Sequence, residues 1–215
     1  METEFRLPIE KYEEKGDVTS DRKLAHLQIC LEHDVQARNI TTGLEDISFV
    51  HCATTDLNLE DIDISVEIFN KKLNTPLIIS GMTGGHAFAH KLNHFLSQAV
   101  QQTNIGMGVG SQRAALEKDN VRESFDIVRK NAPNSLIIGN IGAGQIAQDL
   151  SYDQFQKIID MIEADAVAIH FNPLQEAIQP EGDTKLTNLH KKATSLINEV
   201  SIPVIAKEVG SGFSS

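Results

Sequence analysis

The 215-residue sequence has little or nothing of several features that mark special classes of protein. Its two cysteines, Cys30 and Cys52, lie far apart and outside any CxxC pattern, which excludes a disulfide framework; we expect reduced thiols in a cytoplasmic protein. No apolar run approaches the roughly 20 residues that cross a bilayer. The N-terminal stretch METEFRLPIEKYEEKGD lacks the apolar region of a signal peptide, so we expect no secretory signal.

The sequence has fewer basic than acidic residues, 19 Lys and Arg against 30 Asp and Glu, and its formal net charge is −11. Nucleic acids and anionic membranes bind surfaces with excess Lys and Arg, so we expect neither as a partner. A small anionic ligand is not excluded, because a few converging basic residues suffice to bind one diphosphate. Hydrophobic residues make up 40% and charged residues 23%, which is the balance of an ordinary globular protein with a core to bury.

What the sequence does contain is a series of apolar runs that begins near residue 73 and recurs about every thirty residues, the length of a βα unit. Continuous apolar residues predict strands that are buried on both faces. Amphipathic helix patterns lie between them at 151–163, which opens with a capping box from Ser151 to Gln154, and at 184–200. The predicted strands are TPLIIS (75–80), NIGMGVG (104–110), SLIIGNIG (135–142), AVAIHFN (166–172) and IPVIAKEVG (202–210).

This alternation predicts an α/β fold with a parallel sheet, either doubly wound or a (β/α)8 TIM barrel. The barrel is favoured because glycines and polar residues follow every strand, whereas a doubly wound sheet binds its ligand at one switch point. Only about five βα units are present, so we expect an incomplete barrel over residues 73–215, with about three further units outside this chain. Residues 1–72 predict an N-terminal extension with a short helix at 21–33 and small antiparallel strands in SFVHCAT and ISVEIFNKKL.

Three glycine-rich strand ends are candidate binding loops: SGMTGG (80–85), GMGVGSQR (106–113) and GNIGAG (139–144). Small residues let a planar or phosphorylated ligand approach the backbone, although tight turns explain the glycines of the first and third loops equally well. The G-x-G of the second loop is a weak dinucleotide signal, because no acidic residue follows at the spacing of a Rossmann unit. Arg113 in that loop is a natural anion clamp.

The fourth strand ends in HFNPLQE, which brings His170, Asn172, Gln175 and Glu176 within seven positions. Asn-Pro supplies a turn, but a turn requires neither an imidazole nor a carboxylate. These are either surface residues around a bend or side chains that face a ligand. Lys207 ends an otherwise apolar strand, where desolvation costs on the order of several kcal/mol unless the ammonium meets an anion. It is the strongest single-residue indication of an anionic partner.

His86, His90 and His94 are spaced at i, i+4 and i+8, so they share one face of a helix. This spacing would suit metal ligands, but no Glu completes a zincin-like motif. We therefore favour a partly solvated helix flank for these three residues.

Taken in order, RKLAHL, SGMTGG, GSQR, GNIG, HFNPLQE and KEVGSG resemble the type 2 isopentenyl-diphosphate Δ-isomerases, which are FMN-dependent (β/α)8 enzymes of isoprenoid synthesis. The resemblance runs from about residue 21 to the C-terminus, and HFNPLQE and the RKxxH start are specific to that family. Other FMN barrels, such as the 2-hydroxy-acid oxidases, share only the glycine-rich strand ends and a strand Lys.

The resemblance implies roles for individual residues. Gln175 and His170 would be catalytic, and Glu176 would hold Mg²⁺ against the substrate diphosphate. Lys207 would stabilise the anionic reduced flavin. The flavin would be bound by Ser80, Gly81, Met82, Thr83, Ser111, Asn140 and Lys207. The substrate would be bound by Arg22, Lys23, His26, Ser111, Gln112, Arg113, Asn172 and Gln175.

The implied activity interconverts isopentenyl diphosphate and dimethylallyl diphosphate, with reduced FMN as acid and base, NADPH as reductant and Mg²⁺ on the diphosphate. The resemblance also implies a homotetramer or larger ring. Two alternatives stay open: an FMN-dependent 2-hydroxy-acid oxidoreductase, and a non-catalytic truncated fragment. The family binds the FMN phosphate in loops after the last barrel strands, which we expect beyond the end of this chain.

Overall fold

A computed structural model of the chain describes residues 18–179, 182–210 and 212–214. The chain divides into two units, Met1–Ile64 and Ser65–Ser215. In the first unit, helix α1 spans Val18–Glu32, which confirms the helix predicted at 21–33 but begins before its predicted start. Two short 3-10 helices follow, η2 (Leu44–Asp46) and η3 (Leu59–Asp61).

The strand predicted in SFVHCAT is wrong, because residues 48–54 form neither helix nor strand. Phe49 and Val50 are 92% and 98% exposed. These apolar side chains have no sheet face to bury them, and a strand-like segment without a partner strand does not form a ladder.

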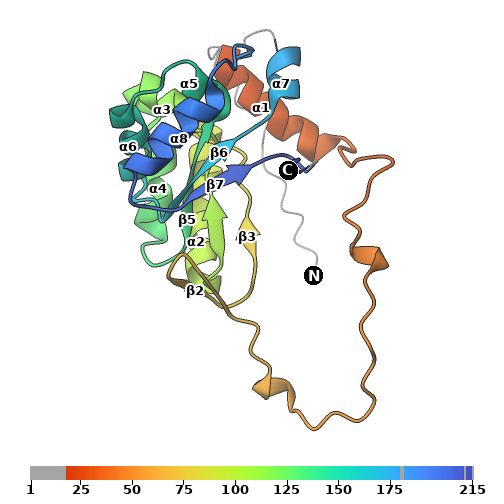
Figure 1. The fold of residues 1–215 in the computed structure, drawn as a ribbon. Coiled ribbons are helices and arrows are strands. Elements are labelled where there is room, and N and C mark those ends of the chain that lie inside the picture. Colours follow the sequence, from red (N-terminus) through yellow and green to blue (C-terminus); the bar gives the residue numbers. More distant parts are fainter. Residues whose placement is uncertain (1–17, 180–181, 211, 215) are drawn as a thin grey trace. The chain divides into compact units, whose positions relative to one another are not determined.

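The second unit is built on a five-stranded parallel sheet in the order β3-β4-β5-β6-β7, which curls into a half-barrel (Figure 1). Each strand falls within one of the five predicted apolar runs. The observed strands are shorter than the runs, because the ends of each run form the flanking turns. The strands are β3 (Ile78–Ile79), β4 (Gly106–Gly108), β5 (Ile137–Gly142), β6 (Ala166–His170) and β7 (Val204–Lys207).

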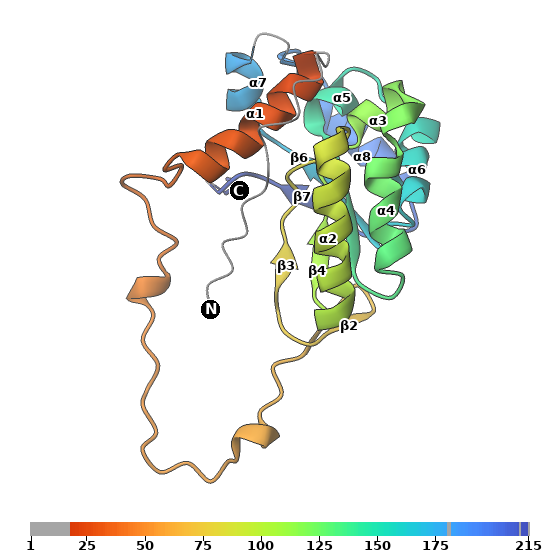
Figure 2. The ribbon, with the colours of Figure 1, turned by 180° about the vertical axis from the view of Figure 1, so that it is seen from behind.

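Helices cover the convex side of this sheet, which Figures 1 and 2 show from opposite directions. The main core lies between sheet residues such as Met107 and Ile169 and helix residues such as Phe125 and Phe155. None of the helices in the described ranges is long and apolar enough to cross a membrane. The helices are α2 (Ala87–Thr103), α3 (Arg113–Glu117), η4 (Asp119–Val121), α4 (Glu123–Asn131), α5 (Ala143–Ala147), α6 (Tyr152–Met161), α7 (Pro173–Ile178) and α8 (Leu189–Glu199).

Both predicted helix patterns are confirmed, with different boundaries. α6 begins after the capping box of Ser151 and Gln154, whose reciprocal hydrogen bonds are both present. α8 begins only at Leu189, because Asn188 has a left-handed backbone with φ 61° and cannot continue a helix toward its N-terminus.

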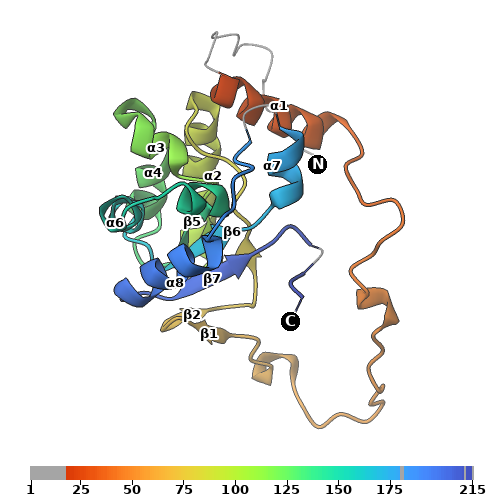
Figure 3. The same ribbon diagram turned by 45° about the horizontal axis from the view of Figure 1, so that its top comes forward.

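An antiparallel hairpin covers the N-terminal end of the concave face. β1 (Val66–Ile68) pairs with β2 (Lys71–Leu73), which confirms the strands predicted in ISVEIFNKKL. The buried side chain of Leu73 packs against Leu136 and Ile138, and Figure 3 shows the hairpin beside the sheet. The concave face is therefore filled at this end, and space for a ligand is left toward the carboxyl ends of the strands.

Arg129 joins the elements at the N-terminal end of the strands. Its guanidinium donates to the carbonyl oxygens of Ile162 at 3.1 Å and Ser135 at 3.1 Å, and to the Asp165 carboxylate at 2.8 Å. The same carboxylate accepts from the Ile137 N–H at 2.9 Å. A single buried cation thus ties α4 to the turn before β6 and to the start of β5.

Candidate functional site

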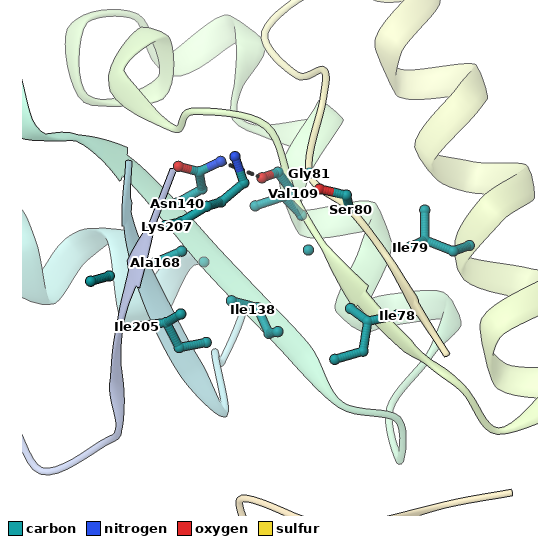
Figure 4. A pocket seen from close by; sticks show the side chains of 13 residues that line it. Ile78, Ile79, Ser80, Gly81, Val109, Ile138, Asn140, Ala168, Ile205 and Lys207 are labelled. Atoms are coloured by element: carbon teal, nitrogen blue, oxygen red, sulfur yellow. Dashed lines mark hydrogen bonds between the residues drawn. The ribbon is translucent and has the colours of Figure 1, made fainter. Parts of the chain in front are cut away.

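A pocket of about 340 Å³ lies on the concave face toward the carboxyl ends of the strands (Figure 4). Successive residues of a strand point to opposite faces, so Ile138 and Asn140 both face this side while Ile137 joins the main core. The wall is largely apolar, with Asn140 and Lys207 at its polar end. The lining residues are Ile78, Ile79, Ser80, Gly81, Gly108, Val109, Ile138, Gly139, Asn140, Ala168, Ile205, Ala206 and Lys207.

Asn140 lines this pocket and carries an unsatisfied hydrogen-bond acceptor. Its Nδ2 donates to the Val109 carbonyl at 3.0 Å, the contact drawn as a dashed line in Figure 4. Its Oδ1 is buried and has no hydrogen-bond partner among the described residues. Because a buried acceptor without a partner costs about 1–3 kcal/mol, this atom is suited to a donor on a bound ligand.

Gln112 requires a correction, because its side chain is fully buried. Its Nε2 donates to the Ile158 carbonyl at 2.9 Å, and its Oε1 accepts from the Asn140 N–H at 3.0 Å. Both ends of the amide are used by the protein, so we remove Gln112 from the candidate substrate contacts. Its role is to support the backbone of Asn140.

The glycines of SGMTGG are explained by close packing. A Cβ on Gly81 would lie 2.1 Å from the Val109 carbonyl oxygen, and a Cβ on Gly84 would lie 2.0 Å from the Phe125 ring. Gly85 has φ 78°, a conformation that favours glycine. The loop is therefore a tight turn, and at Gly81 it also lines the pocket.

Met82, Thr83 and Ser111, the other predicted flavin contacts in these loops, do not line this pocket. Met82 is 59% exposed, and it is absent from the pocket wall that the described residues form. Thr83 is buried, and its Oγ1 has no hydrogen-bond partner in the described part of the chain. Ser111 is partly exposed at the start of the next loop. A flavin role for these three residues stays a prediction.

Lys207 and His170 lie side by side on neighbouring strands, as their register pairing requires. The Lys207 Nζ lies 3.2 Å from the His170 Nδ1. An ammonium group only donates, so the imidazole accepts at Nδ1 and carries its proton on Nε2. Burial lowers the pKa of His170, and the Lys207 charge lowers it further. Burial also lowers the pKa of Lys207.

Asn172 holds Gln175 in one orientation. The Asn172 Oδ1 accepts from the Gln175 N–H at 3.2 Å and so caps α7, while its Nδ2 donates to the Gln175 Oε1 at 2.6 Å. With its carbonyl oxygen occupied, the Gln175 side chain presents its NH₂ group. Asn172 therefore orients the neighbouring amide.

Glu176 and Arg113 meet at a third residue, Asp183, which is 8% exposed. The Asp183 carboxylate accepts from the Arg113 Nη1 at 3.1 Å and from the side-chain amides of Gln145 and Gln148. Its backbone N–H donates to the Glu176 Oε2 at 2.6 Å. The cation and the carboxylate predicted for the site are thus held by one residue.

Arg113 also pairs with Glu117, one turn later on α3, at 2.9 Å. Burial acts to lower the pKa of Arg113, but Glu117, Asp183 and Glu176 outweigh burial and raise it. Arg113 is therefore a permanent cation in acidic surroundings. The Arg113 side chain is still 43% exposed, which leaves part of the guanidinium accessible.

Three predicted substrate contacts fall in the N-terminal unit. The side chains of Arg22 and Lys23 lie outside the described residues. His26 is exposed on α1. Substrate binding by these residues stays a prediction.

The histidines of α2 have structural contacts. The His86 Nδ1 caps the helix by accepting from the Phe88 N–H at 3.1 Å, and the His94 Nδ1 lies 3.0 Å from the Asn131 Nδ2. Nowhere in the described residues do three or more His, Cys, Asp or Glu side chains form a group that could hold a metal. The helix-flank interpretation is therefore favoured over a metal site.

The sequence was also compared with known proteins. The chain is similar to proteins named isopentenyl-diphosphate delta-isomerase. It is 49% identical to that of Methanococcus maripaludis, with 90% of this chain and 55% of the relative covered. The protein of Nostoc sp. is 47% identical, with 91% of this chain and 56% of the relative covered. The protein of Ignicoccus hospitalis is 46% identical, with 90% of this chain and 53% of the relative covered. No family model matches the chain. The chain spans about half the length of these relatives.

Sequence reasoning missed Asp183, Gln145 and Gln148. The glutamines lie on and just after α5, a helix of five residues that the sequence analysis did not predict. Asp183 follows a Gly in an irregular segment, where a carboxylate is common for solubility alone. Only the burial of Asp183 distinguishes it from a surface residue.

Proposed function

We propose that the protein is an isopentenyl-diphosphate Δ-isomerase of the FMN-dependent type 2, with the half-barrel as part of a (β/α)8 barrel. The observation that carries the proposal is the convergence of Lys207, His170 and Asn140 at the carboxyl end of one parallel sheet. Barrel enzymes build their active sites at this end. The similarity to proteins named as this isomerase supports the same conclusion.

The pocket residues fit a flavin. An apolar wall of Ile78, Ile138 and Ile205 suits a planar ring system, and the Asn140 Oδ1 is an acceptor in need of a donor. Gly81 lets the ring approach the backbone. Lys207 supplies a positive charge for the anionic reduced form. When bound and reduced, FMN supplies an electron-rich ring that stabilises carbocation character at the substrate.

The residues beyond the pocket fit a diphosphate with its metal. Arg113 offers a forked donor to phosphate oxygens. Glu176 offers a hard carboxylate oxygen, and Mg²⁺ typically uses one or two carboxylates together with substrate phosphates. A single carboxylate is therefore a sufficient protein contribution. Arg22, Lys23, His26 and Ser111 are proposed as further substrate contacts.

The proton chemistry is assigned to Gln175 and His170. Asn172 donates to the Gln175 Oε1, so the NH₂ group of Gln175 is left to orient or relay the proton. The neutral His170 carries its proton on Nε2, so it can donate a hydrogen bond while Lys207 stays charged. NADPH as reductant and a homotetramer remain part of the proposal.

The test is an isomerisation assay. The full-length protein with FMN bound is reduced under anaerobic conditions with Mg²⁺, and isopentenyl diphosphate is followed by NMR. We expect conversion to dimethylallyl diphosphate, with a loss of about 10²-fold or more in Gln175→Ala and none in Gln156→Ala, a control on the exposed side of α6. No conversion by the wild type would refute the proposal. Flavin reduction by lactate or glycolate would instead favour a 2-hydroxy-acid oxidoreductase.

A further inference from the structure

Asp183 has no part in the function proposed above, yet it is a buried carboxylate with an unusual number of donors. It accepts from Arg113 and from the amides of Gln145 and Gln148. A buried carboxylate is costly unless it is both paired and hydrogen-bonded. The three donors, which come from α3 and the region of α5, meet that requirement.

The backbone on both sides of this carboxylate is closely packed. A Cβ on Gly144 would lie 2.5 Å from the Asp183 Cβ, and a Cβ on Gly182 would lie 1.8 Å from the Glu176 carbonyl oxygen. Real Cβ atoms do not make such contacts, so neither position has room for a side chain. The backbone around Asp183 therefore packs against α5 and Glu176 as closely as glycine allows.

We propose that Asp183 is a positioning residue that sets the Arg113 guanidinium and the Glu176 carboxylate for a single ligand. Its carboxylate fixes the cation, and its backbone N–H fixes Glu176 at 2.6 Å. The identity of the ligand, a magnesium-bound diphosphate ester, rests on the proposed function. The positioning itself rests on the contacts alone.

Pre-ordering matters here because an arginine side chain loses much rotamer freedom when it binds. A guanidinium that is already held by a buried partner loses less, so more of its interaction with a phosphate appears as affinity. Glu117 also pairs with Arg113, but its side chain is 55% exposed whereas that of Asp183 is 10% exposed. Exposed pairs contribute little, so Asp183 rather than Glu117 is the residue that orders Arg113.

The first measurement tests, without any diphosphate, whether rotation of the Arg113 guanidinium is restricted. In ¹⁵N–¹H spectra of the FMN-loaded protein, we expect separate Nη–H signals for Arg113 in the wild type because its rotation is restricted. Asp183→Asn should average these signals, and Glu117→Gln should retain them. The buried Arg129, which lies at the opposite end of the strands, serves as the internal reference.

The second measurement is the affinity for magnesium pyrophosphate by calorimetry. Asp183→Asn should bind it about 10- to 100-fold more weakly, the usual loss when a supporting partner of a ligand-binding residue is removed. Its FMN affinity should be unchanged. Gly144→Ala displaces Asp183 without removing its charge and should weaken binding in the same direction. In an Arg113→Ala background, the loss caused by Asp183→Asn should be smaller, because the two residues act together.

The outcomes separate the two proposals. If the wild type does not bind magnesium pyrophosphate, the proposed function fails and the Arg113 spectra decide the positioning alone. Unchanged Arg113 signals in Asp183→Asn would overturn the inference. So would averaged signals with unchanged pyrophosphate affinity, since the ordering would then serve no ligand.

Discussion

His170 and Lys207 illustrate how a single contact determines protonation in this site. The Lys207 Nζ lies 3.2 Å from the His170 Nδ1. Burial and then the Lys207 charge disfavour the protonated imidazolium and so lower the pKa of His170. We expect His170 to titrate below its usual value of 6.5 in an NMR titration. Lys207→Met should raise the His170 pKa toward that value, and Lys207→Arg, which keeps the charge, should not.

The same shift sets the sign of a pH dependence. The folded-state pKa of His170 lies below the unfolded value, so the unfolded chain binds more protons as the pH falls below the usual histidine range. The contribution of this residue to stability is present above that range and is lost as the pH falls through the folded-state pKa. A His170 pKa that does not move in Lys207→Met would contradict this account.

Gly81 supports a second prediction at the residue scale. Because a Cβ here would lie 2.1 Å from the carbonyl oxygen of Val109, the residue after β4, Gly81→Ala must displace the loop that lines the pocket. We expect FMN affinity, measured by flavin fluorescence quenching, to fall about tenfold or more. Ala114→Gly, a change of similar size on α3, is the control. Equal FMN affinity in Gly81→Ala and wild type would show that the loop does not contact the flavin.

At the scale of elements, Arg129 connects α4, the turn before β6 and the start of β5 through one buried guanidinium. Lysine cannot supply its forked set of donors. We expect Arg129→Lys to lower the free energy of unfolding by about 1–3 kcal/mol, because lysine leaves buried carbonyl oxygens such as those of Ile162 and Ser135 without a donor. Urea unfolding measures this change.

The matched control is Arg122→Lys, since Arg122 pairs with Asp126 on the same helix and is 51% exposed. It should change the free energy of unfolding by less than about 0.5 kcal/mol. A similar effect for both substitutions would mean that Arg129 does not link these elements. The comparison also separates the stabilising end of the strands from the ligand-binding end.

At the scale of the half-barrel unit, the concave face keeps apolar side chains at its open end, and Ile78 is 42% exposed. Such a surface binds hydrophobic dyes. We expect the 215-residue chain to increase the fluorescence of anilinonaphthalene sulfonate. Ile205→Glu should weaken dye binding. Ile197→Glu, on α8, should not, although Ile197 is 41% exposed. Equal binding by both variants would place the dye elsewhere.

The parallel sheet could be predicted from the sequence because a strand buried on both faces must be apolar throughout, and five such runs are present. SFVHCAT was misleading because a short segment with apolar residues forms a strand only where a partner strand and a core exist. The candidate site was predicted in part. Lys207 and Asn140 line one pocket, but Gln112, adjacent to Arg113, points into the core.

The sequence by itself determined the order of the five parallel strands, the helices that became α6 and α8, and the glycine-rich, polar loops at the strand ends, because these depend on local periodicity and turn chemistry. Tertiary structure alone decided that Gln112 supports the backbone, that Lys207 meets His170, and that Asp183 joins Arg113 to Glu176. Contacts of this kind link residues that are far apart in the chain. Their energies depend on burial and donor geometry, which exist only once the chain has folded.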